Sequence, residues 1–169
     1  MTDESITHRR RWLAPGVAFA VTMVFDQVTK VWARHNLTLG RPQKVIDGFW
    51  DWELAWNPGA AFSMFGDGTA RWLLAGIATV ALVAITWMIA KSAPSQRWQR
   101  VALGLVAGGA LGNLVDRVYF GVVTDFVRWR WHEHRWPVFN VADVALVIGA
   151  GIIILDSLRK PPAPASKSG

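Results

Sequence analysis

Nineteen consecutive residues without a charge, Trp72 to Ala90, lie between Arg71 and Lys91. Only two threonines interrupt the apolar character of this stretch. At about 1.5 Å per residue, a helix of this length crosses a hydrocarbon core of about 30 Å. The stretch therefore predicts a membrane-spanning helix, and a chain that contains it is expected to be an integral membrane protein.

Three shorter apolar runs have a similar character: Trp12 to Phe25, Val101 to Val115 and Val144 to Leu155. Each spans a bilayer only if neighbouring polar residues are counted into the helix. Taken alone, each also fits a core helix of a soluble protein. Beside one clear span, in a chain that is 52% hydrophobic, they favour an all-α integral membrane protein with four transmembrane helices. The expected helices are about 12–33, 71–90, 100–119 and 139–158.

The net charge of +6 is concentrated near the ends of the predicted spans. Basic clusters precede the first span (9–11), join the second to the third (91–100) and follow the fourth (159–167). Positively charged residues next to span ends mark the cytoplasmic side of a membrane. This distribution argues against a nucleic-acid partner and predicts that both termini are cytoplasmic. Residues 1–11 and a disordered tail at 159–169 are then cytoplasmic, whereas 34–70 and 120–138 are periplasmic.

The first outer segment has the alternation and aromatic content of short β-strands at Lys44–Asp47 and Phe49–Trp56. The sequence Asn57-Pro58-Gly59 then predicts a turn. We expect a small periplasmic β-sheet with aromatic faces on the membrane interface, between the first two helices. His132 and His134 lie in a predicted loop without a third ligand nearby, so no metal site is expected. The chain has no cysteine and hence no thiol nucleophile.

Three predicted helices carry an acid at about the same depth. Asp116 and Asp143 each lie sixteen residues from a basic residue at the cytoplasmic end of their helix, roughly 24 Å away. By the same arithmetic, Asp26 lies at roughly 22 Å. An ionisable group at that depth costs about 3 kcal/mol unless it is paired or reaches water. Lys30, one turn after Asp26, is a partner for that acid, and the pair favours a structural role.

Asp143 has no basic neighbour along the chain, and it shares a predicted helix face with Asn140. Its candidate partners are Arg117 on another helix or a second acid that shares a proton with it. Two carboxyls held close together cannot both ionise, so one stays protonated while the other is charged. The charged group can take a proton from water, and the protonated one can hydrogen-bond a scissile carbonyl. Asn113 and Arg117, one turn apart, either line such a site or brace it.

Two interpretations without catalysis are a proton relay that uses the buried acids and a lipid-binding scaffold. A relay needs ionisable groups across the whole membrane. The acids instead lie in one outer layer, and residues 72–90 carry none. A scaffold does not need two unpaired carboxylates. Acid chemistry of the aspartic-protease kind is therefore favoured.

Five motifs resemble, in order along the chain, those of the bacterial lipoprotein signal peptidases, also called signal peptidase II. The resemblance covers roughly residues 12–158, which we expect to form a single membrane-embedded peptidase domain. The motifs are Asp26-Gln27-Val28-Thr29-Lys30, Asn57-Pro58-Gly59-Ala60-Ala61-Phe62-Ser63, the segment from Gly108 to Arg117, Val123-Thr124-Asp125-Phe126, and Phe139-Asn140-Val141-Ala142-Asp143.

The resemblance implies an aspartic endopeptidase that removes signal peptides from diacylglyceryl-modified prolipoproteins, cleaving just before the lipidated cysteine. It also implies that Asp125 and Asp143 are the catalytic pair. Depth alone would instead favour Asp26 or Asp116 as the partner of Asp143. Asp125 has to fold back from the outer segment into the site, and Phe120-Gly121 can permit that return.

The remaining expectations also come from the resemblance. Thr124 departs from the family, in which valine is usual before the acid. No cofactor and no metal are implied. The expected partners are prolipoprotein substrates with diacylglyceryl-cysteine and membrane lipids, for a monomer of the bacterial inner membrane whose site lies near the periplasmic face. The residues expected to bind substrate or to orient the acids are Asn57, Asn113, Arg117 and Asn140. The residues expected to give structural support are Asp26, Lys30 and Asp116.

Overall fold

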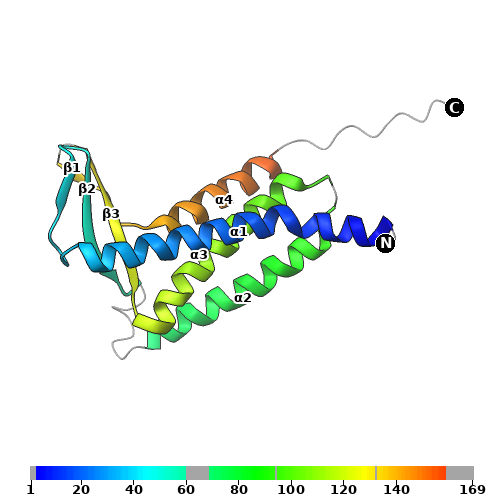
Figure 1. The fold of residues 1–169 in the computed structure, drawn as a ribbon, viewed down its shortest axis with the longest axis horizontal. Helices are drawn as coiled ribbons and strands as arrows, with labels where there is room; N and C mark the ends of the chain where they lie inside the picture. The colour runs from blue at the N-terminus through cyan, green and yellow to red at the C-terminus, as the bar shows by residue number, and fades with distance from the viewer. Residues whose placement is uncertain (1–2, 60–68, 94, 132, 159–169) are drawn as a thin grey trace.

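The computed structural model describes residues 3–59, 69–93, 95–131 and 133–158. Within these residues, four helices pack side by side into an elongated bundle, and a small sheet lies at one end of it (Figure 1). The first helix begins and the last helix ends at the opposite end of the bundle, where the second helix is also joined to the third. The helices are α1 (Asp3–Asn36), α2 (Thr69–Lys91), α3 (Arg97–Phe120) and α4 (Val141–Ser157).

Three of these helices are long and apolar enough to cross a membrane: α1 over Arg11–Asn36, α2 over Ala70–Lys91 and α3 over Arg97–Phe120. The prediction of a membrane-spanning helical bundle agrees with this result. The fourth helix has 17 residues, which corresponds to about 26 Å and falls slightly short of the hydrocarbon core. Four crossings therefore stay a prediction. The first helix extends beyond both predicted ends, and α4 begins two residues later than expected.

The small-residue segment of α3 lets its neighbours approach closely. A Cβ at Gly108 would lie 2.9 Å from a carbonyl oxygen of α1, and one at Gly109 would lie 2.5 Å from the carbonyl oxygen of Ala142 on α4. A Cβ at Gly112 would overlap the carboxylate of Asp26. Small residues at helix interfaces allow this approach in membranes. The segment is therefore a packing face, and α3 contacts each of the other three helices.

Among the described residues, four antiparallel strands form the sheet, in the order β1-β2-β3-β4. The two strands predicted in the first outer segment are present as β1 and β2. The expectation that the sheet lies only between α1 and α2 is wrong, because β3 and β4 come from the second outer segment. A two-stranded ribbon is marginally stable, and pairing with β3 covers an edge of β2. The strands are β1 (Gln43–Ile46), β2 (Trp50–Asn57), β3 (Val123–Trp131) and β4 (His134–Arg135).

Two features hold the sheet against the bundle. Gly121 ends α3 in the left-handed conformation, with a φ of 79°, and its N–H bonds back to the helix. Glycine adopts this conformation without the steric cost that other residues bear, so the chain reverses directly into β3. An apolar cluster then joins the elements, with Ala33 of α1 and Leu37, just after that helix, packed against Leu54 of β2 and Phe126 of β3.

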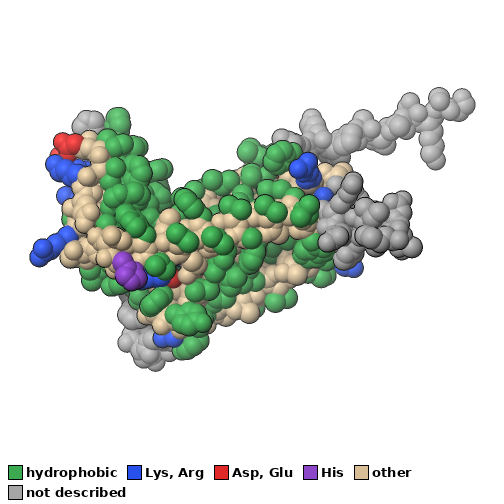
Figure 2. Space-filling view, in the orientation of Figure 1, with side chains coloured by type: hydrophobic (Ala, Val, Ile, Leu, Met, Phe, Trp, Pro, Cys, Tyr) green, Lys and Arg blue, Asp and Glu red, His purple; other side chains and the backbone are tan. Residues whose placement is uncertain are grey.

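Hydrophobic side chains cover much of the visible flank of the bundle and the part of the sheet nearest to it (Figure 2). Charged side chains gather at the outer edge of the sheet and toward the opposite end of the bundle. The surface is hollowed between the sheet and the bundle. An apolar flank between charged ends is the distribution expected for a protein embedded in a bilayer.

Some sequence expectations concern residues outside the described ranges. These residues are the Ala60-Ala61-Phe62-Ser63 part of the second motif, His132, and the tail at 159–169. The expectations for them, including disorder of the tail, stay predictions.

Candidate active site

The start of α4 is formed by an asparagine and an aspartate that cap each other. The side-chain oxygen of Asn140 accepts the backbone N–H of Asp143 at 3.0 Å, and Asp143 Oδ2 accepts the backbone N–H of Asn140 at 3.1 Å. This reciprocal capping box satisfies two donors that a helix start leaves unpaired. The three-residue spacing that places both side chains on one face is thus also a helix-start signal, which the sequence reasoning overlooked.

Asp125 reaches the same place from β3. It is 1% exposed, and both of its carboxylate oxygens accept amide donors. Asn57 Nδ2 donates to Oδ2 at 2.9 Å, and Asn140 Nδ2 donates to Oδ1 at 2.6 Å. Because Asn140 also donates its backbone N–H to Asp143, the two acids share one hydrogen-bonding partner. The structure thus brings together the pair that the family resemblance implies.

Asn113 of α3 connects this pair to the interior of the bundle. Its Nδ2 donates to Asp143 Oδ1 at 2.9 Å, and its Oδ1 accepts from Asn140 Nδ2 at 3.2 Å and from Lys30 Nζ at 2.9 Å. A lysine ammonium can only donate, so the amide oxygen of Asn113 has to face it. The amide N–H groups therefore point toward Asp143, and Lys30 fixes the orientation of a side chain that contacts the acid.

A fully buried ion-pair cluster lies next to this network. Lys30 Nζ is 2.9 Å from Asp26 Oδ2 and 3.6 Å from Asp116 Oδ2. The expected pairing of Asp26 with Lys30 is confirmed, and Asp116 joins it from α3. Asp26 Oδ1 also accepts the backbone N–H of Ala142 at 2.9 Å. Acids from three helices therefore do lie at one level, but Asp26 and Asp116 are compensated by a cation that ties the helices together.

Arg34 is not among the sequence predictions, yet it contacts Thr124, the residue before Asp125. Arg34 Nη1 donates to Thr124 Oγ1 at 2.8 Å and lies 3.5 Å from Asp116 Oδ1, and its guanidinium lies 4.5 Å from the ring centroid of Phe120. The backbone N–H of Thr124 donates to Asp116 Oδ2 at 2.8 Å. A valine at this position could not accept from Arg34. The four-residue spacing from the preceding lysine of α1 is the signal that could have found this arginine.

Arg117 supplies a positive charge near both acids. Its guanidinium interacts electrostatically with Asp143 and Asp125, and Nη1 donates to the carbonyl oxygen of Asn113 at 3.4 Å. A Cβ at Gly59 would lie 3.9 Å from Nη2. Arg117 therefore lies where the turn after β2 approaches α3, and its role in lining or bracing the site stays a prediction.

Burial raises the pKa of Asp125 to about 6. The hydrogen bonds from Asn57 and Asn140 oppose this increase because they stabilise the carboxylate, whereas the negative charge of Asp143 adds to it. A carboxyl with this pKa can donate or accept a proton near neutral pH. Within the described residues, no group of three or more His, Cys, Asp or Glu side chains is placed to hold a metal ion.

Residues 18–159 match the family described as Signal peptidase (SPase) II. The chain belongs to the signal peptidase II family. A member of this family is a peptidase and therefore a hydrolase. The match begins at residue 18, within α1, and ends just after α4. It therefore includes all the residues of the site described above.

Curated relatives of this signal peptidase II chain extend over most of its length. A lipoprotein signal peptidase of Teredinibacter turnerae is 48% identical over 146 residues, which cover 85% of each chain. One from Polynucleobacter necessarius is 41% identical over 152 residues, which cover 89% of this chain and 90% of the relative. A solved structure of a bacterial membrane enzyme is 31% identical and superimposes with a TM-score of 0.77 over 87% of this chain and 94% of the other. The fold and the membrane character of the chain agree with this comparison.

Proposed function

We propose that this chain is a membrane aspartic endopeptidase that removes signal peptides from diacylglyceryl-modified prolipoproteins and cleaves just before the lipidated cysteine. Its relatives at 48% and 41% identity are named lipoprotein signal peptidases, which supports the substrate class. The observation that carries the mechanism is the double contact of Asn140, whose amide donates to Asp125 and whose backbone N–H donates to Asp143. A shared partner of this kind orients both acids toward one substrate.

We assign the shared proton to Asp125 and the negative charge to Asp143. Burial keeps the pKa of Asp125 at about 6, well above that of an ordinary carboxyl group. Asp143 accepts hydrogen bonds from Asn113 and from the backbone N–H of Asn140 in the first turn of α4, where the helix dipole favours an anion. Two acids in such different surroundings divide the acid and base roles between them.

In the proposed reaction, the Asp143 carboxylate takes a proton from water, and the resulting hydroxide bonds to the scissile carbonyl carbon. Asp125 gives its proton to the carbonyl oxygen, so a neutral gem-diol forms and the dyad's one proton now lies on Asp143. The carbon–nitrogen bond then breaks, Asp143 protonates the leaving amine, and a gem-diol hydroxyl returns a proton to Asp125. The dyad regains its starting state, with a carboxyl-terminated signal peptide and a lipoprotein with a free cysteine amine as products.

The surrounding residues receive supporting roles in this proposal. Each contacts one of the acids or the network that orients it, as described above. The buried cluster is assigned a structural role because Lys30 already compensates the negative charges of Asp26 and Asp116. We assign substrate binding or dyad orientation to Asn57, Asn113, Arg117 and Asn140, and structural support to Asp26, Lys30 and Asp116.

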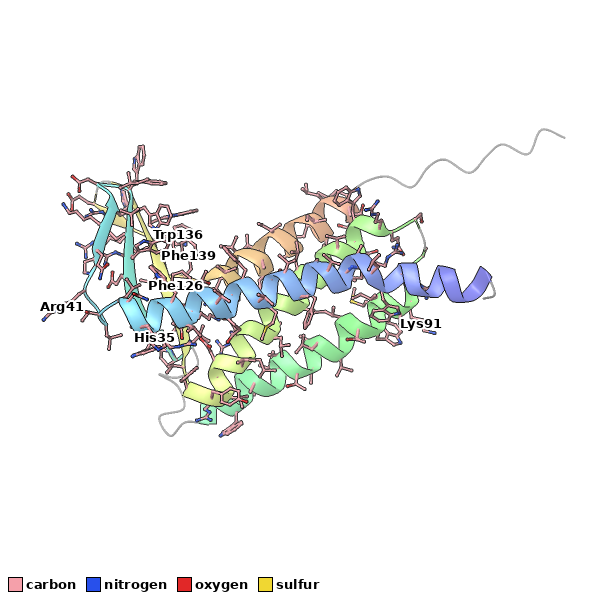
Figure 3. All side chains as sticks on the ribbon, in the orientation of Figure 1. His35, Arg41, Lys91, Phe126, Trp136 and Phe139 are labelled. Carbon is pink, nitrogen blue, oxygen red and sulfur yellow. The ribbon has the colours of Figure 1, made fainter. Side chains whose placement is uncertain are left out.

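We further propose four crossings of the bacterial inner membrane, with both termini cytoplasmic and the site near the periplasmic face. The acids lie at the sheet end of the bundle, whereas Lys91 lies at the other end, where α2 is joined to α3 (Figure 1 and Figure 3), which supports this orientation. The short α4 can cross where the bilayer thins locally. One chain supplies both acids, so a monomer is sufficient.

The test is cleavage of a purified prolipoprotein in detergent, with and without diacylglyceryl on its cysteine. We expect the wild-type protein to cleave only the lipidated form. Asp125→Asn and Asp143→Asn should each lower turnover by at least about 10²–10⁴-fold while the protein stays folded, because each removes one proton-transfer group. Full activity in either variant would rule out the dyad. If the folded wild-type protein cleaves neither form, proton flux in liposomes would test the relay interpretation instead.

A further inference from the structure

A groove of about 710 Å³ runs between α1 and α3 at the end of the bundle opposite the sheet, where both helices begin (Figure 1). Two kinds of side chain line it, aliphatic side chains from α1 and two arginines from the start of α3. None of the lining residues belongs to the candidate active site. They are Leu13, Ala14, Val17, Ala18 and Val21 of α1, and Arg97, Arg100 and Val101 of α3.

The groove lies beside a line of close contact between the two helices. A Cβ at Gly104 would lie 2.9 Å from the Cα of Pro15, and the same test brings Gly108 against Thr22 and Gly112 against Asp26. The residue numbers rise together on both helices, so α1 and α3 run parallel. Two helices in such close contact leave a furrow beside the contact line, and the groove occupies that furrow.

The charged and apolar parts of the groove lie at different depths. Arg97 and Arg100 precede Gly104 on α3 and lie roughly 10 and 6 Å from its level, toward the end of the bundle. Val21 lies roughly 9 Å from the level of Pro15 in the opposite direction, toward the sheet. The groove is therefore cationic at its outer end and apolar farther into the bundle, which is the order of headgroup and acyl chain in a bilayer leaflet.

The aliphatic wall forms a continuous stripe along α1. Leu13, Val17 and Val21 follow one another at four-residue intervals and are 54–68% exposed. Val21 also lines a second apolar groove, which continues along α1 through Val24 to Val28. From Leu13 to Val24 the helix rises roughly 16 Å. One leaflet of a hydrocarbon core is about 15 Å deep, so the stripe has the length needed to contact an acyl chain of that leaflet.

The outer end of the groove favours an anion for two reasons. Arg97 is exposed, and Arg100 is buried with its Nη1 donating to the carbonyl oxygen of Ala93 at 2.6 Å, so packing holds the second guanidinium in place. The first turn of α3 contains no acid, and Gln96 provides no side-chain cap for it among the described residues. Guanidinium groups and the start of a helix both bind phosphate well.

We propose that this groove binds an anionic phospholipid, with its phosphate at Arg97 and Arg100 and one acyl chain along the α1 stripe. In the proposed orientation this lipid belongs to the cytoplasmic leaflet. A zwitterionic phospholipid would bring its ammonium group near two arginines, so a headgroup with a net negative charge is favoured. An apolar helix of another protein would cover the stripe but would give the arginines no counter-charge.

The test measures lipid binding to the full-length protein in detergent by native mass spectrometry. The protein is titrated with phosphatidylglycerol or phosphatidylcholine that carry the same acyl chains, and the Kd of the first bound lipid is compared. We expect the wild-type protein to prefer phosphatidylglycerol. Arg97→Gln should lower this preference by about fivefold, the effect of one basic residue at a membrane surface.

Lys91→Gln is the matched control for charge. It removes one positive charge from the same end of the bundle (Figure 3), and Lys91 is exposed and outside the groove lining. It should keep the wild-type preference. An equal loss in Lys91→Gln and Arg97→Gln would show a diffuse attraction to that end of the bundle, and an unchanged preference in Arg97→Gln would show that the phosphate lies elsewhere. Either result overturns the proposal.

Val17→Trp fills the apolar part of the groove and should weaken binding of both lipids by about tenfold, which corresponds to about two methylenes left unburied. Val83→Trp is its control, because Val83 is 67% exposed on α2 and outside the groove lining. If Val17→Trp does not fold, Val21→Trp fills the same groove. Unchanged affinity in the folded variant, or a wild-type dimer that is lost in it, would overturn the proposal, the latter by assigning the groove to a second copy of the chain.

Discussion

Replacing Asn57 by alanine should move the alkaline limb of the pH–rate profile to higher pH. In the proposed reaction the active dyad holds one proton on Asp125, so kcat/KM falls as the pH rises through the pKa of about 6. The amide of Asn57 donates to Asp125 Oδ2 at 2.9 Å and stabilises the ionised form. Without this donor the pKa of Asp125 rises, and the singly protonated dyad persists to higher pH.

The size of the shift follows from the strength of the lost hydrogen bond. A hydrogen bond to a charged group contributes about 1.5–3 kcal/mol, and one pKa unit corresponds to about 1.4 kcal/mol. Asp125 is only 1% exposed, so little bulk water is available to replace the donor. The expected shift is therefore about one to two pH units.

The assay measures kcat/KM with a lipidated prolipoprotein in detergent, from about pH 5 to about pH 9. Asn36→Ala is the control, because Asn36 is an exposed residue at the end of α1 whose amide donates to the carbonyl oxygen of Trp32. Its profile should match the wild type. The alkaline limb of the profile reports the titration of the two coupled acids together. The pH at which the limb falls is therefore compared between variants, and the absolute rate is not. A limb that stays in place or moves to lower pH in Asn57→Ala would refute the assignment of the proton to Asp125.

Two further substitutions test the packing around the site. Asp116→Asn removes a fully buried charge that faces two basic side chains at 3.5 and 3.6 Å, so thermal unfolding in detergent should show a loss of about 3 kcal/mol. Normal stability without turnover would instead point to Asp116 as a catalytic acid. Gly109→Ala places a methyl group 2.5 Å from the carbonyl oxygen of Ala142, and we expect a loss of about 1–3 kcal/mol together with slower turnover. Gly151→Ala, whose added Cβ would meet nothing within 4 Å, should leave both unchanged.

Prediction from the sequence worked best where a residue's environment depends on its near neighbours. The pairing of Asp26 with Lys30 follows from one helical turn, and the structure contains it at 2.9 Å. The same reasoning failed to rank the partners of Asp143. Depth favoured Asp26 and Asp116, but the cation between them compensates both acids. Charge compensation between helices cannot be read from spacing along one helix.

The sheet shows the same limit. Strand propensity indicated β1 and β2, but the residues of β3 were predicted only to belong to the outer segment 120–138. Its pairing with β2 joins residues as far apart along the chain as Trp50 and Trp129. It also brings Asp125 within hydrogen-bonding distance of Asn57, which is 68 positions away. The choice of Asp125 came from the resemblance to a family, and no pattern within its own segment indicated that it returns to the bundle.

The sequence by itself determined the apolar helices and the level at which the acids lie. A helix in lipid satisfies its own backbone hydrogen bonds, so its length and composition are sufficient to define it. The tertiary structure alone decided which two acids meet. That pairing requires the reversal at Gly121, the alignment of β3 on β2, and the cap at the start of α4. These contacts join segments distant along the chain, and their free energy is gained only when the whole bundle has assembled.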